Sequence, residues 1–248
     1  MRLKASLESE LRNARRRLGR DAGPTAVHEA RKAIKKLRAG LRLGRKAFGR
    51  KAVEQADRPL RAAGHSLGPL RDRQVLRETA GELRKPGEAV PRLPGPPPSG
   101  AAYAREARRR LGQAAERLKG LPGNEADSAA LAEGLKRLYR QGRRAGRKAL
   151  RDRSDAALHA WRRRTKDLLL ALPLMGAVPA SLTKKAGRLA ELLGADRDLA
   201  AFAASPAARG KKGRPLRRRA AKRRRKLQEK AFRLGKRLYR RRPGGLRP

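Results

Sequence analysis

The segment from residue 27 to residue 48 places its basic and its apolar side chains on two neighbouring faces of a helix. At about 100° per residue, one histidine and four cations fall within an arc of roughly 80°. These residues are His28, Arg31, Lys35, Arg38 and Arg42. Branched apolar residues occupy the adjacent face. No stretch of the chain alternates with the two-residue period of a strand, so we expect an all-α fold.

The same stripe returns 131 residues later, between residues 158 and 174. His159, Arg162 and Lys166 repeat the spacings of the first copy, whereas Leu169 and Pro173 stand where the first copy has its last two arginines. We therefore expect a second basic wall that is shorter than the first. A chain that is merely basic gives no reason for a histidine to head the same row twice.

A second motif, Leu-Gly-x-x-Arg-Asp, occupies residues 67–72 and has a weaker copy at residues 193–198. Two motifs that recur in the same order at similar offsets predict an internal duplication. We expect a single domain of two pseudo-symmetric, four-helix-bundle-like halves, residues 1–121 and 122–248, that face each other about an approximate twofold axis. The Leu-Gly pairs suggest a tight approach of two helices at residues 68 and 194.

Glycine and proline mark the expected helix boundaries. Thr25 follows Gly23-Pro24 and is a candidate N-cap for the striped helix. Residues 86–100 contain six prolines and are expected to form a loop. A helix is expected over residues 181–193, with the second Leu-Gly copy starting a new segment, and a last helix over residues 216–240.

The charge balance points to a polyanionic partner. Lys and Arg number 68 against 22 Asp and Glu, a formal net charge of +46 on 248 residues. Repulsion on this scale disfavours the compact state, so a bound polyanion should stabilise the fold. Aromatic residues make up only 3%, too few for a surface that stacks bases. Nucleic acid, polyphosphate, an anionic membrane and an acidic protein are all open as partners on charge alone.

The sequence lacks the residues that most catalytic sites need. It has no cysteine and no His-x-x-x-His pair, so we expect no metal site. No acidic cluster suits two metal ions and no GxxxxGK[ST] loop occurs, so we expect no cofactor and no catalysis. The amino terminus has no apolar signal segment, and the longest uncharged stretch, residues 168–183, is too short to cross a bilayer. We expect a cytoplasmic protein without a membrane partner.

Two aspartates stand out in a chain with few carboxylates. Asp72 and Asp198 close the two copies of the second motif, and we expect them to be structural residues that orient a basic side chain of the facing stripe. Arg71 and Arg197 then either join that arrangement or face the anion. The two stripe histidines similarly either contact the ligand or orient a neighbouring aspartate.

These motifs resemble the CHAD family, the conserved histidine α-helical domain. The family pattern is a histidine followed at +3, +4 and +7 by basic residues, once in each half. The matching residues are His28, Arg31, Lys32 and Lys35, and His159, Arg162, Arg163 and Lys166. The Leu-Gly-x-x-Arg-Asp element matches a second family motif, and the long helix before His159 is also similar to the family.

The resemblance implies a two-bundle helical fold with a basic central cavity that binds inorganic polyphosphate, often at polyphosphate granules. It implies that the following residues line the cavity: His28, Arg31, Lys32, Lys35, Arg38, Arg42, His159, Arg162, Arg163 and Lys166. Further candidates for binding are Arg71, Tyr139, Arg140, Arg143 and Arg197. Family members are sometimes joined to, or encoded beside, a triphosphate tunnel domain, so granule-associated or tunnel-domain proteins are candidate partners.

Two alternatives stay open. The basic run over residues 211–226 and the extreme charge also fit a protein that binds the backbone of RNA or DNA. Against this alternative stand the few aromatic residues and the lack of a helix-turn-helix signal. A scaffold that recruits a partner through the proline-rich loop or the C-terminal tail is compatible with polyphosphate binding.

Overall fold

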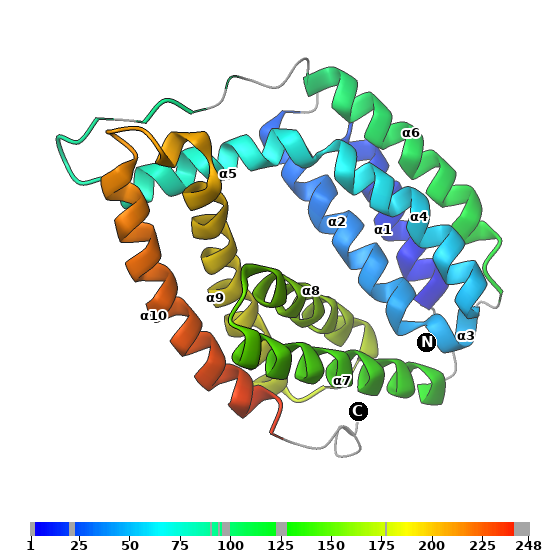
Figure 1. The fold of residues 1–248 in the computed structure, drawn as a ribbon. Helices are drawn as coiled ribbons and strands as arrows, with labels where there is room; N and C mark the ends of the chain where they lie inside the picture. The colour runs from blue at the N-terminus through cyan, green and yellow to red at the C-terminus, as the bar shows by residue number, and fades with distance from the viewer. Residues whose placement is uncertain are drawn as a thin grey trace.

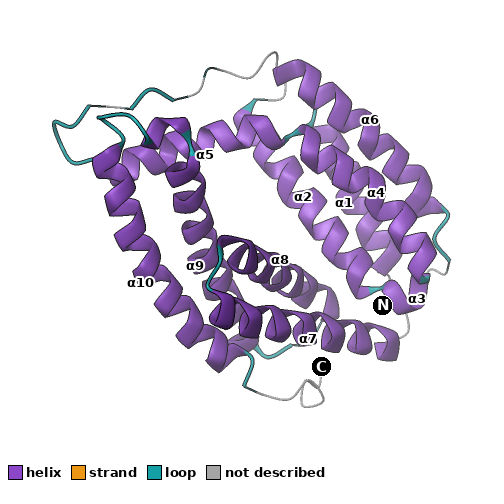
Figure 2. Cartoon of the chain, viewed as in Figure 1, coloured by secondary structure: helices purple, strands orange, loops and turns teal. Residues whose placement is uncertain are grey.

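The structure is a computed structural model that describes residues 3–19, 23–89, 91–93, 95, 100–122, 128–176 and 178–240. Within these residues it contains ten α-helices, two short 3₁₀ helices and no strand (Figure 2). The prediction of an all-α fold is confirmed. The described residues of the proline-rich segment are not helical up to residue 95, but Gly100 already begins a helix.

The helices form two groups (Figure 1). The first contains α1 (Leu3–Arg17), α2 (Pro24–Leu43), the short α3 (Arg45–Phe48), α4 (Arg50–Ser66) and α6 (Gly100–Lys119). The second contains α7 (Ser128–Asp152), α8 (Asp155–Ala171), α9 (Ala180–Ala204) and α10 (Arg214–Leu238), with 3₁₀ turns at Leu172–Met175 and Pro206–Ala208. α2 packs against α8, so the two striped helices face each other between the groups.

α5 (Gly68–Leu83) joins the two groups instead of completing the first one (Figure 1). It packs against α9 and α10, where Ala80 and Leu83 share a small separate core with Phe202 and Leu216. Glu82 also forms an ion pair with Arg223 of α10 at 3.2 Å. The larger core is built mainly from leucine and alanine and includes residues of both groups.

The striped helix α2 is shorter than expected at its C-terminal end. It begins at Pro24, with Gly23 as N-cap and without a side-chain cap, so the N-cap prediction for Thr25 is wrong. Proline is well suited to the first helical position because it has no N–H to leave unpaired. The helix stops at Gly44, where a Cβ would lie 2.8 Å from Leu3 and 2.6 Å from Phe48.

The two Leu-Gly pairs do not mark tight helix contacts. A Cβ at Gly68 would meet nothing within 4 Å, and one at Gly194 would meet only Arg162 Nε at 3.9 Å. That prediction is wrong. A close approach between the groups occurs instead at Gly134 of α7, where a Cβ would collide with the carbonyl oxygen of Leu43.

Candidate functional site

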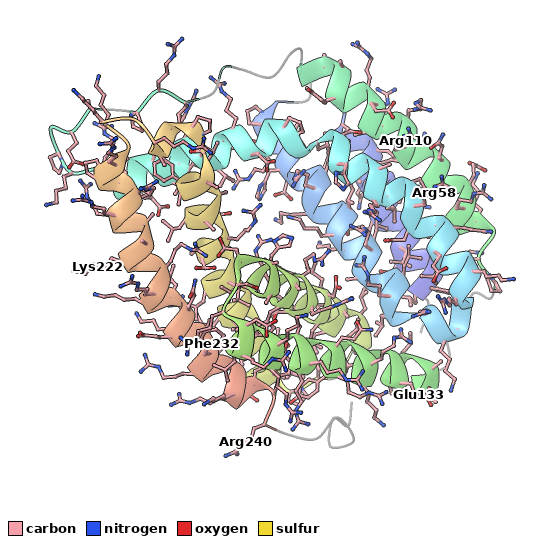
Figure 3. All side chains as sticks on the ribbon, viewed as in Figure 1. Arg58, Arg110, Glu133, Lys222, Phe232 and Arg240 are labelled. Atoms are coloured by element: carbon pink, nitrogen blue, oxygen red, sulfur yellow. The ribbon has the colours of Figure 1, made fainter. Side chains whose placement is uncertain are left out.

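A pocket of about 730 Å³ lies between the two groups of helices and is lined from α2, α4, α5 and α8. Figure 3 shows side chains of both groups reaching into the space between them. Among the described residues that line it, nine are Lys or Arg and three are Asp. The cations are Arg31, Lys35, Arg38, Arg42, Arg61, Arg162, Arg163, Arg164 and Lys166, and the acids are Asp57, Asp72 and Asp167.

Four of these cations form what we call the unpaired cluster: Arg31 and Lys35 of α2, and Arg162 and Lys166 of α8. Arg31 and Arg162 stand at matching positions of the two stripes, and so do Lys35 and Lys166. Within the described part of the chain, none of the four makes an ion pair within 4 Å. Arg31 is held in place by a hydrogen bond from Nη1 to the carbonyl oxygen of Gly64 at 2.9 Å. The cluster therefore keeps its positive charge available to a ligand.

The unpaired cluster is electrostatically strained. The pKa of Lys35 is lowered to about 8. The larger cause is partial removal from bulk water, and the smaller one is repulsion from Arg31, Arg162, Lys166 and Arg71. Lys35 nevertheless keeps contact with water in the pocket. Burial and then repulsion from Arg162 also lower the pKa of Lys166. An anion placed among these groups would relieve the repulsion.

Two buried nitrogen atoms, Nε of Arg162 in the unpaired cluster and Nδ1 of the nearby His159, have no hydrogen-bond partner among the described residues. A buried donor that lacks a partner costs roughly 1–3 kcal/mol, so most such groups are satisfied in folded proteins. Both residues line the pocket. Because neither atom is accessible to solvent, these two unpartnered nitrogens do not by themselves indicate a bound ligand.

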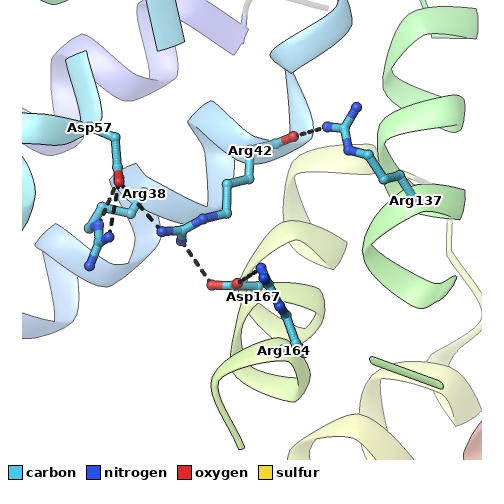
Figure 4. A network of polar contacts seen from close by, with 6 residues as sticks. All are labelled: Arg38, Arg42, Asp57, Arg137, Arg164 and Asp167. Carbon is cyan, nitrogen blue, oxygen red and sulfur yellow. Dashed lines mark hydrogen bonds and ion pairs between the residues drawn. The ribbon is translucent and has the colours of Figure 1, made fainter. Parts of the chain in front are cut away.

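The other end of the pocket holds what we call the paired cluster: Arg38, Arg42, Asp57, Arg164 and Asp167 (Figure 4). Arg38 donates to both oxygens of Asp57, at 2.7 and 3.0 Å. Arg42 lies 3.6 Å from Asp57 and 2.9 Å from Asp167, and Arg164 lies 3.6 Å from Asp167. Its carboxylates therefore already neutralise part of the positive charge at this end.

Asp167 is the more deeply placed of the two acids, with 15% of its side chain exposed. Burial raises its pKa, while the neighbouring Arg42, Arg164 and Arg38 oppose that rise. Arg137 of α7 donates to the carbonyl oxygen of Arg42 and helps to fix the end of α2 (Figure 4). The network thus connects α2, α4, α7 and α8. It also borders a second pocket of about 550 Å³, which shares Arg42, Asp57, Arg61 and Arg164 with the first.

A comparison with protein-family models matches residues 3–192 to the CHAD domain. The chain belongs to the CHAD domain family. The matched residues include every side chain that lines the pocket, whereas the whole of α10 lies beyond them. A comparison with curated proteins found no match.

Two observations on this CHAD domain concern membrane spanning and metal binding. No helix in the described part of the chain is long and apolar enough to cross a membrane. The described side chains also include no group of three His, Cys, Asp or Glu residues that could hold a metal ion.

The two stripe histidines occupy different environments. His159 lines the pocket. Its pKa is lowered mainly by burial and, to a smaller extent, by repulsion from Arg197. His28 is exposed and is not among the residues that line the pocket. Its pKa is also lowered, by partial burial and by Arg71. Both histidines are therefore biased toward the neutral form, and the two copies of the family motif are not equivalent in this chain.

The aspartates of the second motif lie near the unpaired cluster but make no ion pair within 4 Å among the described residues. Asp72 attracts Arg31, and Asp198 attracts Arg162, through longer electrostatic interactions. Burial raises the pKa of Asp198. The orienting role of both acids stays a prediction. Arg71 forms an ion pair with Glu78 at 3.4 Å, and Arg197 is exposed beside His159.

Four residues carried over from the family resemblance lie away from the pocket. Tyr139 is completely buried, and its hydroxyl donates to the carbonyl oxygen of Leu238 at 2.8 Å. Arg143 lines a different pocket, between α7 and α10, and Arg140 is exposed near Glu133. Lys32 is exposed and pairs with Glu29 at 3.0 Å. None of these four residues lines the pocket, and their part in polyphosphate binding stays a prediction.

Conversely, the pocket contains residues that the sequence patterns did not indicate: Asp57, Arg61, His65, Arg164 and Asp167. Arg61 and His65 follow Asp57 at helical spacing on α4, which brings all three to one face. No motif singles out that face before the fold is known. Asp167 is adjacent to Lys166 of the second stripe, but a single carboxylate next to a lysine carries no specific signal.

Proposed function

We propose that this CHAD domain binds inorganic polyphosphate in the pocket between its two groups of helices, without catalysing a reaction. The observation that carries the proposal is the unpaired cluster, in which Arg31, Lys35, Arg162 and Lys166 line one pocket with no carboxylate within 4 Å among the described residues. Four such cations in one pocket would be poorly placed if they had no anionic partner.

The chemistry of the cluster suits phosphate. Arginine can donate two parallel hydrogen bonds to phosphate oxygens, while lysine acts as a mobile point charge. Polyphosphate is a thin, flexible chain without bases, so it has no need for the aromatic platforms that bind single-stranded nucleic acid. Binding would release counterions and would weaken steeply as salt rises.

We also propose that the pocket arose from the internal duplication. The support is that residues at matching positions of the two stripes, Arg31 with Arg162 and Lys35 with Lys166, line the same pocket from α2 and from α8. A linear polyanion that lies between the two helices would meet one equivalent pair from each. Such a protein would reside in the cytoplasm at polyphosphate granules, where tunnel-domain proteins are candidate partners.

The test compares two ligands and uses a variant. Long-chain polyphosphate and duplex DNA or RNA, matched for moles of phosphate, are titrated separately into the full chain at physiological salt. The variant R31Q/K35Q/R162Q/K166Q should bind polyphosphate at least about 100-fold more weakly, because a hydrogen bond to a charged group contributes about 1.5–3 kcal/mol. Circular dichroism checks that the helix content is unchanged.

A matched control removes four exposed cations outside the pocket: Lys51, Arg105, Arg108 and Arg117, each to Gln. The control lowers the net charge by the same amount but leaves the pocket intact. Its affinity for polyphosphate should therefore fall by a few-fold at most. The proposal fails if the pocket variant loses as much affinity for nucleic acid as for polyphosphate, or if the affinity for polyphosphate falls equally in the control and the pocket variant.

A further inference from the structure

The C-terminal helix α10 has one face that is tied to the rest of the molecule. Arg219 pairs with Glu88, Arg223 with Glu82, and Arg224 with both Asp155 and Asp196. Leu216, Ala220, Phe232 and Leu238 are buried on the same helix. These contacts hold α10 against α9 and the end of α5, so the helix always presents the same face to solvent.

The opposite face of α10 carries cations that have no such partners. Seven of them are exposed: Arg218, Lys222, Arg225, Lys226, Arg233, Lys236 and Arg237. They fall within an arc of about 120° and extend over about 28 Å of helix. We call them the outer row. Within the described part of the chain, none of them has a carboxylate oxygen within 4 Å. One exposed acid, Glu229, lies in the same arc and offsets only part of this charge. Figure 3 shows Lys222 pointing away from the other helices.

The outer row is separate from the polyphosphate pocket. None of the residues that line that pocket comes from α10, and the helices α2, α4, α5 and α8 supply all of them. The row also lies beyond residue 192, where the match to the CHAD family model ends. Its charge is therefore not needed to build the pocket, and solubility alone does not require charge of a single sign.

The composition of this face narrows the kind of partner. Apart from charged residues, the exposed positions of α10 are only Pro215 and Ala221. The face has no aromatic or leucine side chain to insert into a bilayer, to anchor a protein interface or to stack on an unpaired base. What remains is contact with phosphate groups through charge.

We propose that the outer row binds the phosphate backbone of duplex nucleic acid, independently of sequence. The row is straight and rigid, and it is somewhat shorter than one turn of a duplex, which is about 34 Å long. A duplex is likewise a rigid line of charge, with one phosphate per about 1.7 Å of axis. Because the two sites are separate, the protein can hold a duplex on α10 while polyphosphate occupies the pocket.

The test uses the full chain and a fluorescein-labelled 20-base-pair duplex, with binding followed by anisotropy from 50 to 300 mM salt. The variant R218Q/K222Q/R225Q/R233Q removes four charges and keeps a residue of high helix propensity at each position. Its duplex affinity at 100 mM salt should fall at least tenfold. The slope of log K against log salt should decrease by about 0.9 for each phosphate that the variant no longer neutralises. The affinity of the control K51Q/R105Q/R108Q/R117Q should fall no more than about threefold.

The pocket variant R31Q/K35Q/R162Q/K166Q distinguishes this inference from the polyphosphate proposal. It should bind the duplex like the unmodified protein, whereas the outer-row variant should keep its polyphosphate affinity within a few-fold. The inference is overturned if the outer-row variant binds the duplex normally, or if duplex binding weakens to the same extent in the pocket variant. It is also overturned if the outer-row variant no longer binds phosphatidylglycerol vesicles but still binds the duplex. The polyphosphate affinity of the pocket variant tests only the proposal that the pocket binds polyphosphate, and it has no bearing on duplex binding by α10.

Discussion

The two ends of the central pocket both take their cations from α2 and α8, yet they present very different charge. At one end, Arg31, Lys35, Arg162 and Lys166 have no carboxylate within 4 Å among the described residues. At the other end, three arginines share the carboxylates of Asp57 and Asp167 (Figure 4). A stripe of cations on a helix is therefore not uniform. Its capacity for ligand depends on which members the fold has already paired.

The difference has a structural consequence. Arg42 of α2 and Asp167 of α8 form an ion pair across the interface of the two groups at 2.9 Å. Removal of one partner from a partly buried pair leaves an uncompensated charge, which costs more than an exposed pair contributes. The paired cluster is thus expected to stabilise the relative position of α2 and α8. The unpaired cluster is expected to weaken the ligand-free fold and to bind the ligand.

The largest expected effect comes from a matched pair of double variants. R162Q/K166Q removes two unpaired cations, and polyphosphate affinity should fall roughly 100-fold because two charge-assisted hydrogen bonds to phosphate can no longer form. R38Q/R42Q removes two paired cations, and affinity should fall less than about fivefold. Isothermal titration calorimetry at one salt concentration measures both variants.

Thermal unfolding of the ligand-free proteins provides the reverse comparison. R38Q/R42Q leaves Asp57 and Asp167 with fewer partners and should lower Tm, whereas R162Q/K166Q should leave Tm unchanged or raise it. An equal fall in affinity in the two variants would show that the distinction between the two ends has no functional meaning.

A smaller effect is expected from Asp167→Asn. The amide keeps the shape of the side chain and frees Arg42 and Arg164 from a negative charge, so the affinity for polyphosphate should rise about three- to tenfold. The ligand-free protein should unfold more easily by about 1–3 kcal/mol, because the contact between α2 and α8 is weakened.

The matched control for this change is Glu133→Gln, which removes an exposed carboxylate that pairs with Lys46 outside the pocket. It changes the net charge by the same amount and should change affinity by less than twofold. If both variants bind polyphosphate equally well, the gain at Asp167 is a general charge effect and the paired cluster does not restrict the site.

The helices and the centre of the site could be predicted from the sequence because both depend on local spacing. Residues three, four and seven apart share a face of a helix, so the two stripes identify Arg31, Lys35, Arg162 and Lys166 as neighbours. The partners of the paired cluster could not be predicted in this way. Arg38 and Asp57 are 19 residues apart, and Arg42 and Asp167 are 125 residues apart. Their meeting depends on how three helices pack.

The duplicated Leu-Gly motif illustrates a second limit. In the first copy the chain breaks at Leu67 and α5 starts at Gly68, with Pro69 in its first turn. In the second copy the chain runs through Leu193 and Gly194 inside a single helix, α9. Proline lacks the N–H that would continue the hydrogen-bond pattern, and its ring clashes with the preceding turn. The two copies differ at only two positions, and the proline at the first of them accounts for the break in the first copy; the expected break at residue 193 is wrong.

The smallest expected effect concerns the protonation of Lys35 in the unpaired cluster. Its pKa is lowered to about 8 in the folded protein, from 10.5 in the unfolded chain. Between about pH 8 and pH 10.5 the unfolded state binds more protons, so the ligand-free protein should gain stability from this group as pH rises. Polyphosphate favours the protonated lysine, so its affinity should fall over the same range, by at most about tenfold per pH unit. Lys166 titrates in the same direction because its pKa is also lowered.

The variant Lys35→Arg isolates this contribution, because the guanidinium of arginine stays protonated throughout the range. Affinity measured from pH 7 to pH 10 should depend less on pH in the variant than in the unmodified protein, and the two should agree closely at pH 7. The paired cluster supplies the contrast. Arg38→Lys places a lysine beside Asp57, which favours its charged form, so affinity should keep the pH profile of the unmodified protein. Identical profiles for Lys35→Arg and the unmodified protein would mean that charge repulsion in the unpaired cluster is too weak to influence binding.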